Sequence, residues 1–572
     1  MNEMNPSDQE TSLPAMRYGI LCNSAHFQKW QAEAIRELIS HGHILALLIM
    51  DGREQNKKRK GSFAYRYTGG NLLFRILHNR FFQPDAKKFV DLSSFLEGTD
   101  TLTCFPDKRK HSEYFQEAET EAIKTYHLDF ILRFGFNILR GPILDAARFG
   151  IWSFHHDDEL IYRGGPPGFW EIYRGDPVTG LILQRITDKL DAGVILYKGY
   201  LKTMFHSYQG NVEQLLTVSS SWPALIADEI LRNPETIFLP SETKAPVYKV
   251  PGNLRMIAFL VKLFCNRIRF HYRDLLSAEI WNVGLIKKPI HEVVFGPGKL
   301  QKSDITWFRQ FASTKYLADP FGFFENNKLH ILVEDYSYAK QRANISEIIY
   351  DVRRDSFSVP IILIEGEKHL SYPFIVEHED IVYCIPESHR SKNIELYFRN
   401  FSEEAFIKDK VLVTNVDAID PTLFFFENRW WIFFTLRKHS NAHLYIYFSD
   451  SIKGEYMPHQ RNPVKIDVRS SRPGGTPFTH EGILYRPAQD CSITYGGRIV
   501  INKVNRLSPF EFEEVPVTMV NPLKNSPFPK GLHTISQVGD FTLIDGKRYR
   551  LNHYFFKNQL RSKLRKRDPG NV

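Results

Sequence analysis

Cysteine is scarce in this sequence, and no arrangement of it suggests a metal site or a disulfide framework. The five cysteines of the 572-residue chain are scattered, and none forms a Cys-x-x-Cys pair or joins a histidine cluster. Neither a structural zinc site nor stabilising disulfides are therefore expected, and we expect no metal. Isolated thiols are typical of a reducing compartment, so the sequence predicts a cytoplasmic protein.

Long apolar runs and a secretory leader are also missing. No stretch of about 18 uncharged apolar residues occurs, so we expect no transmembrane segment. Residues 1–15 are polar and acidic, unlike a signal peptide, and are expected to form a disordered lead. No G-x-G-x-x-G motif follows the first predicted strand, which argues against a bound dinucleotide.

Positive charge is in excess, with a net charge of +9 at pH 7. The excess either serves solubility, which is the simpler interpretation, or attracts an anionic partner. We expect no nucleic-acid partner. Peripheral contact with a membrane, without a spanning segment, is the alternative that the charge allows.

The length predicts two or three domains, and the N-terminal pattern is that of an α/β fold. Residues 17–22 form a short apolar strand, residues 28–41 an amphipathic helix and residues 44–50 a continuous apolar run. Strand, helix and buried strand in this order are typical of a parallel sheet, so we predict a Rossmann-like domain over residues 16–232. Its later elements are expected at 113–126 (helix), 130–133 (strand), 142–147 (helix), 150–154 (strand) and 206–232 (helical).

A basic helical connector is predicted over residues 233–300. Residues 253–278 mix apolar residues with arginine and lysine, and no acidic residue precedes Asp274. This helix either lies on an anionic membrane or packs between two domains with its basic face in water, and we favour the second interpretation. Residues 557–572 are expected to form a basic, disordered tail.

Short β-like runs repeat between residues 301 and 556. Asp319-Pro-Phe-Gly-Phe-Phe-Glu-Asn-Asn matches Asp420-Pro-Thr-Leu-Phe-Phe-Phe-Glu-Asn, and each copy reads as strand, tight turn, strand. A spacing of about 50 to 60 residues suits one four-stranded propeller blade, so five copies predict a five-bladed β-propeller. The copies lie at 319–334, 372–384, 420–434, 477–485 and 540–549.

Four motifs in the first half stand in a fixed order. Ser153-Phe-His155-His156-Asp157-Asp158 is followed by Tyr162-Arg-Gly164, by Gly175-Asp-Pro-Val-Thr-Gly180 and by Leu190-Asp191-Ala-Gly193. In this order residues 16–232 resemble the folate-dependent formyltransferases, which include methionyl-tRNA formyltransferase and the sugar N-formyltransferases. The resemblance implies formyl-tetrahydrofolate as the formyl donor.

The resemblance also assigns roles to individual residues. His155 would polarise the formyl carbonyl, and Asp191 would orient His155 and a proton-relaying water. Ser153 stands where the family has asparagine, and losing one oxyanion donor typically costs about 10²–10³ in rate. His156 and Asp157 are extra polar groups that either substitute for the missing amide or mark another acceptor. The folate-contacting loop would be Phe134, Gly135, Phe136, Ile138 and Leu139.

The repeat region resembles the five-bladed propellers of arabinanases, invertases and related glycoside hydrolases. Arg486-Pro-Ala-Gln-Asp-Cys491, Tyr495-Gly496 and Gly531-Leu-His-Thr534 are most similar to the N-terminal domain of plant glucosamine inositolphosphorylceramide transferase and its bacterial relatives. In the hydrolases, carboxylates from different blades act as base and acid. The candidates here are Asp319, Glu387, Asp420 and Asp490.

Asp-Pro at the start of a strand is also ordinary turn chemistry, so at least one of Asp319 and Asp420 is expected to be structural. We therefore favour a carbohydrate-binding or accessory propeller over a hydrolase. The sequence as a whole predicts formyl transfer to an amino-sugar in polysaccharide or glycolipid biosynthesis. The alternatives are a glycan-binding protein that has lost catalysis, and a glycosyl-transferring or glycoside-cleaving enzyme run by the propeller.

Overall fold

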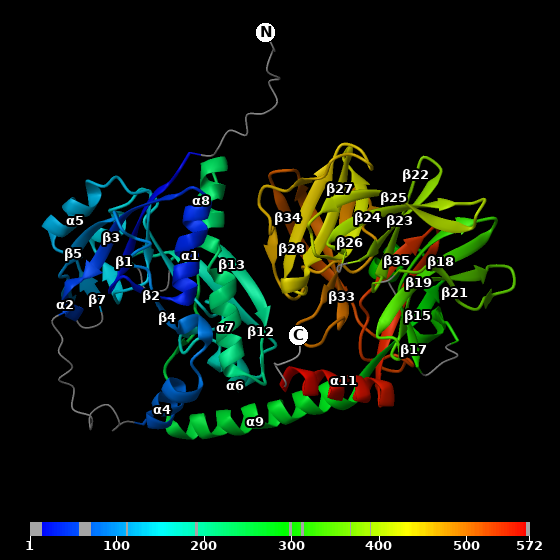
Figure 1. Cartoon of the computed structure of the whole chain (residues 1–572), viewed down its shortest axis with the longest axis horizontal. Helices are drawn as coiled ribbons and strands as arrows, with labels where there is room; N and C mark the ends of the chain where they lie inside the picture. The colour runs from blue at the N-terminus through cyan, green and yellow to red at the C-terminus, as the bar shows by residue number, and fades with distance from the viewer. Residues whose placement is uncertain are drawn as a thin grey trace, which may run out of the picture. The chain divides into compact units, whose positions relative to one another are not determined.

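The chain folds as two compact units (Figure 1). The first comprises residues 1–199 and 203–267, and the second residues 200–202 and 268–572. In this computed structural model none of the helices in the described ranges is long and apolar enough to cross a membrane. The structure describes residues 14–55, 70–109, 112–188, 193–296, 300–309, 314–366, 368–388 and 391–567.

A seven-stranded sheet forms the centre of the first unit, in the order β13-β12-β10-β8-β1-β3-β5. The strands from β10 to β5 are parallel, and β12 runs antiparallel to β10. The predicted parallel sheet is confirmed. The strands are β1 (Arg17–Cys22), β3 (Ile44–Asp51), β5 (Asp100–Cys104), β8 (Phe130–Arg133), β10 (Ile151–His155), β12 (Val178–Arg185) and β13 (Val194–Lys202).

Apolar side chains hold this sheet between helices. On one face Leu21, Leu47 and Ile131 pack with Ile123 of α5 and Ile143 of η2. Strands carry alternate residues to opposite faces, which is why a continuous apolar run such as β3 is buried on both sides. The helices of the first unit are α1 (Lys29–Ser40), α2 (Gly52–Gln55), α4 (Leu72–Phe81), η1 (Asp85–Lys87), α5 (Glu117–Lys124), η2 (Pro142–Asp145), α6 (Phe169–Arg174), α7 (Tyr208–Ser219) and α8 (Trp222–Arg232).

The helix expected over residues 113–126 is shorter than predicted. Its first residues form β7 (Ser112–Tyr114), which pairs in parallel with β9 (Ile138–Arg140). Glu113 is buried in this strand, where its carboxylate accepts hydrogen bonds from Asn137. Short strands complete the unit: β2 (His26–Gln28), β4 (Phe89–Asp91), β6 (Asp107–Arg109), β11 (Arg163–Gly164) and β14 (Val247–Tyr248).

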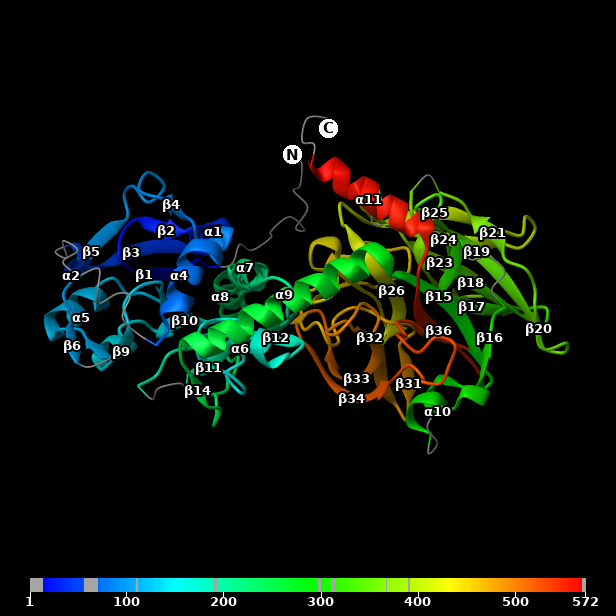
Figure 2. The ribbon, with the colours of Figure 1, turned by 90° about the horizontal axis from the view of Figure 1, so that it is seen from below.

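The stretch expected as a connector contains one long helix and the start of a sheet. Helix α9 (Asn253–Leu276) is uninterrupted along its length (Figure 2). It is followed by β15 (Ala278–Ile286) and α10 (Ile290–Phe295). Part of the expected basic tail is helical, because α11 spans His553–Arg567.

Five antiparallel sheets form the second unit. We number the first four in chain order and call the fifth the closing sheet. The first sheet has β17 (Lys315–Glu325), β18 (Lys328–Ser337), β19 (Arg342–Asp351), β20 (Ser356–Phe357) and β21 (Ile361–Ile364). The second has β22 (Ser371–His378), β23 (Ile381–Glu387), β24 (Asn393–Asn400) and β25 (Ala405–Thr414). The third has β26 (Ala418–Phe426), β27 (Arg429–Leu436), β28 (His443–Ser449), β29 (Met457–Pro458) and β30 (Lys465–Ile466).

The fourth sheet has β31 (Phe478–His480), β32 (Ile483–Asp490), β33 (Arg498–Leu507) and β34 (Phe512–Val520). The closing sheet joins β15 and β16 (Ile305–Trp307) to β35 (Ile535–Val538) and β36 (Phe541–Arg550). Strand β15 pairs with β36 along its whole length, so that the Lys547 ammonium meets the Glu279 carboxylate from 268 residues away, at 3.0 Å.

The first four predicted hairpins are confirmed, and the fifth was wrong. Residues 540–549 are one continuous strand, β36, and the hairpin turn precedes it at Gly539 and Asp540. Gly546, which suggested a turn, lies within the strand. A Cβ there would come within 2.5 Å of the Trp307 ring, so this glycine serves close packing.

The aspartate that opens two of the repeats does not form a turn. Asp319, Tyr372 and Asp420 are equivalent residues at a β-bulge inside the first strand of each hairpin. Each has a positive φ, of 51°, 45° and 50°, and each precedes a proline. Such backbone costs about 1–3 kcal/mol at each position and persists only where surrounding contacts hold it.

A buried ion pair anchors the fourth sheet. Arg486 on β32 donates two hydrogen bonds to Glu514 on β34, at 2.7 and 2.5 Å, and a third to the Ser470 carbonyl. Lys465 approaches the same carboxylate at 2.7 Å. Burial raises the pKa of Glu514, but Arg486 and Lys465 outweigh burial and leave this pKa below its ordinary value.

We expect Glu514→Gln to lower the free energy of unfolding by about 3–5 kcal/mol, because it leaves Arg486 buried without its counter-ion. The lowered pKa means that the wild-type advantage is complete above about pH 4.5 and disappears as the pH falls through the folded-state value. Urea unfolding between pH 3 and 8 measures both effects. Glu513→Gln, in an exposed pair with Arg506, is the control and should change stability by less than about 0.5 kcal/mol.

Candidate functional site

The serine that replaces the expected asparagine is held by an arginine. Ser153 on β10 is buried, and its hydroxyl accepts hydrogen bonds from Nε and Nη2 of Arg133, at 3.1 and 2.9 Å. Arg133 ends the neighbouring strand β8 and also donates to the Asn137 carbonyl at 2.7 Å. Burial lowers the pKa of Arg133, and Glu113 opposes that shift. The sequence analysis missed Arg133, which read only as the last residue of a strand.

A polar network extends from this pair along the carboxyl ends of the parallel strands. Glu113 accepts from the Asn137 backbone and side chain at 2.9 and 2.6 Å, and Arg53 binds Glu113 at 3.0 Å and Asp51 at 2.8 Å. The chain first adds β3 and β5 on one side of β1, and then adds β8 and β10 on the other side. The strand order therefore reverses beside β1. Open α/β sheets bind ligands at the carboxyl edge beside such a reversal.

The two histidines of the motif have different surroundings. His155 is half-buried, with Nε2 3.5 Å from the Tyr162 carbonyl oxygen. His156 stacks on Phe154, contacts Trp30 edge-on and lies 3.1 Å from the Ser219 hydroxyl. Burial lowers the pKa of His156 to about 3. These contacts make His156 a neutral packing residue.

Asp157 is also held within the core. Its Oδ1 accepts the Gly168 backbone N–H at 3.0 Å, and Glu171 of α6 is buried nearby. Burial, reinforced by Glu171, raises the pKa of Asp157 well above its ordinary value, and burial raises the pKa of Glu171 to about 8. Asp191, the expected orienting carboxylate, lies outside the described residues.

The expected folate-contacting loop is packed rather than open. Phe134 contacts Trp30 edge-on at 5.5 Å between ring centroids, and Phe136 packs on Phe115. Leu139 is buried in the core, and a Cβ on Gly135 would come within 2.5 Å of the Asn23 side chain. Ile138 lies on β9. None of these five loop residues lines the cavity described next.

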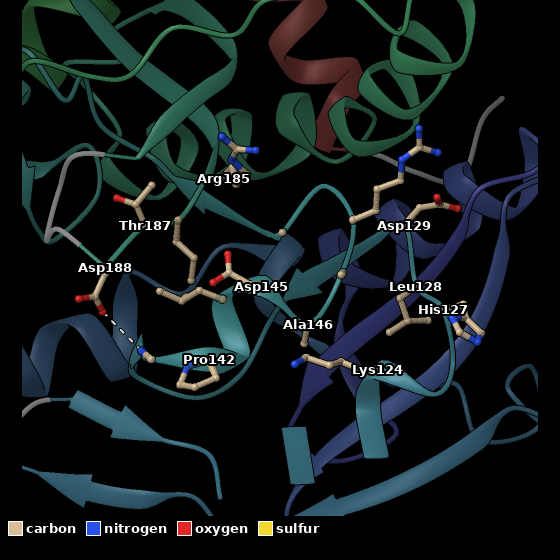
Figure 3. A pocket seen from close by; sticks show the side chains of 16 residues that line it. Lys124, His127, Leu128, Asp129, Pro142, Asp145, Ala146, Arg185, Thr187 and Asp188 are labelled. Atoms are coloured by element: carbon tan, nitrogen blue, oxygen red, sulfur yellow. Dashed lines mark hydrogen bonds between the residues drawn. The ribbon is translucent and has the colours of Figure 1, made fainter. Parts of the chain in front are cut away.

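A cavity of about 1000 Å³ lies beside the chain that follows this loop (Figure 3). Its lining includes Gly141, two residues after Leu139. It lies at the amino ends of β8 and β10, where Asp129 and Gly150 line it, and Ser153 and His155 do not. The Gly141 N–H donates to Asp188 on its wall at 3.4 Å. Asp188, on this wall, thus lies only two and three residues before Leu190 and Asp191 in the chain. Its polar lining is Lys124, His127, Asp129, Asp145, Arg148, Arg185, Thr187 and Asp188.

A second polar cluster occupies the centre of the second unit. Two residues that are equivalent in successive repeats, Glu334 and Glu387, come from the second strand of each hairpin, and Asp319 and Asp420 come from the bulges of the first strand. All four are buried. The sequence analysis missed Glu334, although its place in the repeat is that of Glu387.

Hydrogen bonds through this cluster connect each sheet to the next and the closing sheet to the first. The bonds are Tyr372 N–H to Asp319 (3.2 Å), Asp420 N–H to Glu387 (3.1 Å), Arg472 Nε to Asp420 (2.6 Å), Thr476 N–H to the Ile535 carbonyl (3.1 Å) and Thr534 hydroxyl to Asp319 (2.8 Å).

Asp319 and Asp420 both have structural partners. Asp420 also accepts Gln489 Nε2 at 2.7 Å. Burial, partly offset by Arg472, raises the pKa of Asp420 to about 7. Asp490, the third predicted aspartate, ends β32 and accepts hydrogen bonds from the Ser492 N–H and Arg498 Nε, at 2.9 and 2.8 Å. The carboxylates of Asp319, Asp420 and Asp490 therefore all accept hydrogen bonds from backbone N–H groups or from arginine side chains.

His533 lies between two carboxylates. Its Nδ1 contacts Asp545, and its Nε2 is 3.4 Å from Asp319. Burial lowers the pKa of His533, but Asp545 and Asp319 outweigh burial and raise it overall. One ligand atom from each of these residues lies within 4.8 Å of the others, the spacing of a metal site. A protonated imidazole supplies the positive charge that this trio needs.

Glu334 differs from the other carboxyl groups of the cluster. Its nearest polar contacts are long, 3.5 Å to both the Tyr316 hydroxyl and His369 Nε2. Burial, reinforced by Asp319 and Glu387, raises the pKa of Glu334 well above its ordinary value. Burial therefore favours the protonated form of this carboxyl group.

Comparison with known proteins relates the chain to transferases. The family model "Glucosamine inositolphosphorylceramide transferase 1, N-terminal" matches residues 279–531. Glucosamine inositolphosphorylceramide transferase 1 of Oryza sativa subsp. japonica is 31% identical over 212 residues, which are 36% of this chain and 28% of that protein. Methionyl-tRNA formyltransferase of Prochlorococcus marinus is 27% identical over 158 residues, 26% of this chain and 45% of that protein.

The chain thus spans less than half the length of either relative. Among solved structures, glycinamide ribonucleotide transformylase 1 of Symbiobacterium toebii aligns with 40% of this chain and 95% of its own, at 15% identity and a TM-score of 0.27. Both relatives are transferases, which agrees with the predicted class of enzyme and leaves the transferred group open.

The opposite surroundings of His156 and His533 predict opposite charge states. Nuclear magnetic resonance of ¹³C-labelled histidine between pH 5 and 8 should show His156 neutral throughout, because burial disfavours its charged form. His533 should titrate with a midpoint above 6.5, because two carboxylates stabilise its charged form. His156→Gln and His533→Gln assign the signals. A His156 midpoint above 6 would return this residue to the set of acid–base candidates.

Proposed function

We propose that this protein is a transferase that formylates an amino-sugar of a polysaccharide or glycolipid, using formyl-tetrahydrofolate. The observation that carries the proposal is the Arg133–Ser153 pair at the motif position. Two guanidinium N–H groups bind the serine oxygen there, so the serine proton is directed away from Arg133. The pair offers a hydrogen-bond donor backed by a positive charge where the family has a neutral amide.

The residues around this pair have complementary tasks. Formyl transfer develops negative charge on the carbonyl oxygen, which the Ser153 hydroxyl and His155 would stabilise by donating hydrogen bonds. Arg133 is a positioning residue in this scheme, because it acts through Ser153. Asp191 would accept the proton that the attacking amine loses, directly or through water. That proton would pass to the leaving nitrogen of the donor as its bond to the formyl carbon breaks.

The lining of the cavity fits a folate in chemical terms. An aminopyrimidinone edge pairs with carboxylates such as Asp145 and Asp188, and a glutamate tail pairs with cations such as Lys124 and Arg148. Gly150 on the cavity wall lies three extended residues, about 10 Å, from Ser153. A donor held in the cavity would therefore extend along β10 to present its formyl group to Ser153 and His155. The packed loop that includes Phe134 and Leu139 would support the wall of this site from behind and would not itself contact the donor.

The second unit is proposed to hold the sugar acceptor as a five-bladed propeller. The closed circuit of hydrogen bonds among the five sheets supports a ring, and the matched transferase family supports a glycan or glycolipid ligand. Binding is favoured over cleavage because Asp319, Asp420 and Asp490 are occupied by structural partners.

One observation favours glycosidic-bond chemistry as a second candidate. Glu334 is a buried acid with a strongly raised pKa and only long polar contacts, as a general acid requires. We expect Glu334→Gln to leave sugar binding within about threefold of wild type if the unit only binds. A loss of glycoside cleavage or glycosyl transfer of about 10³-fold or more, with binding retained, would establish this second function instead.

The formyl-transfer proposal is tested by a double-mutant cycle at the Arg133–Ser153 pair. With nucleotide-linked amino-sugars as acceptors, Ser153→Ala and Arg133→Met should each lower kcat by about 10²–10³. Because the two residues act as one unit, the double variant should be no slower than the worse single variant. Multiplicative losses would contradict the assigned positioning role.

Donor binding is measured separately by calorimetry with the stable analogue 5-formyl-tetrahydrofolate. Arg148→Met should weaken it by about 10-fold or more, since a charge-assisted hydrogen bond is worth about 1.5–3 kcal/mol. Arg36→Met, at an exposed pair on α1, is the matched control. Failure of the wild type to bind this analogue would remove the formyl-transfer proposal and leave the sugar-binding role of the second unit standing.

A further inference from the structure

Helix α9 carries an apolar stripe that its own packing does not bury. Leu254, Ile257, Val261 and Phe264 recur at intervals of three and four residues, and Ile268 continues the series. This spacing places them along one line of the helix. Their side chains are 83%, 49%, 58%, 64% and 55% exposed. We call Leu254, Ile257, Val261, Phe264 and Ile268 the α9 stripe.

A different face of the same helix holds α9 to the first unit. Met256 and Phe259 are fully buried, and Phe259 stacks on Phe169 with 4.1 Å between ring centroids. Leu260 and Leu263 pack against the same core cluster. The rotation of α9 is therefore fixed by its buried face, and the stripe cannot turn inward without breaking that packing.

Basic side chains border the stripe on both sides. Arg255, Lys262, Arg267, Arg269 and Arg273 are all exposed, and no acidic residue occurs in α9 before Asp274. That aspartate is paired with Lys563 at 2.7 Å. From Asn253 to Arg273, α9 thus combines an apolar line with basic side chains and no acidic residue.

We infer that the α9 stripe docks on an anionic lipid bilayer. Helices of 20 to 30 residues with apolar side chains on one face and arginine and lysine beside them lie in the membrane interface, with the apolar face in the acyl boundary. At 1.5 Å per residue, the 24 residues of α9 extend about 36 Å, enough to place the whole stripe in the plane of the bilayer. The helix lies on the surface and does not span it.

Charge is what selects lipid over a protein partner. A protein interface of this kind needs carboxylates opposite cations on both sides of the stripe, whereas an anionic leaflet presents negative charge everywhere along the helix. Apolar insertion and electrostatic attraction then act together. The inference does not depend on which group the enzyme transfers, and it would bring the active unit to lipid-linked acceptors.

The test is co-sedimentation of the full chain with sucrose-loaded vesicles. We expect binding to phosphatidylglycerol–phosphatidylcholine vesicles and at least about tenfold weaker binding to pure phosphatidylcholine, since cationic residues near an anionic surface each add to the affinity. Raising the salt from 0.1 to 1 M should weaken binding, because the Debye length falls from about 10 to about 3 Å.

Matched variants separate insertion of the α9 stripe from nonspecific hydrophobic adsorption to the vesicles. Leu254→Ser/Val261→Ser/Phe264→Ser should lower vesicle affinity by about tenfold or more, and Arg267→Gln/Arg269→Gln should remove most of the preference for anionic lipid. Ile237→Ser/Leu239→Ser removes two equally exposed apolar side chains elsewhere in the first unit and should change nothing. The triple variant alters only exposed positions, so circular dichroism should confirm an unchanged fold.

Two results would overturn the inference. The first is wild-type protein that stays in the supernatant with anionic vesicles. The second is a triple variant that binds vesicles as well as the wild type does. If the wild type ignores vesicles but is a dimer in light scattering that the triple variant converts to a monomer, the stripe is a contact between two copies. Loss of vesicle binding with formyl transfer intact would leave the proposed function untouched.

Discussion

The second unit depends on the neutralisation of buried charge at its centre. Five carboxyl groups gather there with one guanidinium, that of Arg472, and one imidazole, that of His533. The carboxyl groups belong to Asp319, Glu334, Glu387, Asp420 and Asp545. Burying unpaired charge is prohibitive, so the carboxyl groups must be protonated, paired or hydrogen-bonded to backbone. Asp319 and Asp420 do this by binding the next sheet or the one before it. The same contacts therefore link neighbouring sheets and occupy carboxylate oxygens of these two aspartates.

Much of this architecture follows from sequence pattern, and the exceptions have physical causes. Periodicity found β1, α1 and β3, and self-similarity found four hairpins, because both signals are local. The fifth hairpin was missed because glycine at 546 makes room for Trp307, a contact that no local pattern reveals. Asp319 was recognised as important but not as a bulge, since positive φ before proline is rare and depends on the cluster it faces.

The candidate sites show the same division between local and long-range information. Ser153 and His155 were identifiable by motif, but the partner that changes the meaning of Ser153 is Arg133, twenty residues earlier on the next strand. His156, predicted to substitute for the missing amide or to mark another acceptor, has its ring packed beside Trp30, which the motif alone does not reveal. The serine at position 153 thus comes with an arginine that binds its hydroxyl, a pairing that a motif read along the chain does not contain.

The pairing of β15 with β36 sets the order of events when the chain is made. Residues that meet in this sheet are 268 positions apart, so β15 leaves the ribosome long before its partner exists. Until β36 is made, the edge of β15 is unpaired and available to other strands. The first four sheets can then form while the closing sheet is still incomplete. The family match ends at residue 531, before β35 and β36. A fragment that ends at residue 531 would keep β15 and lose its partner β36. A fragment made for expression should therefore extend at least to residue 550, the end of β36.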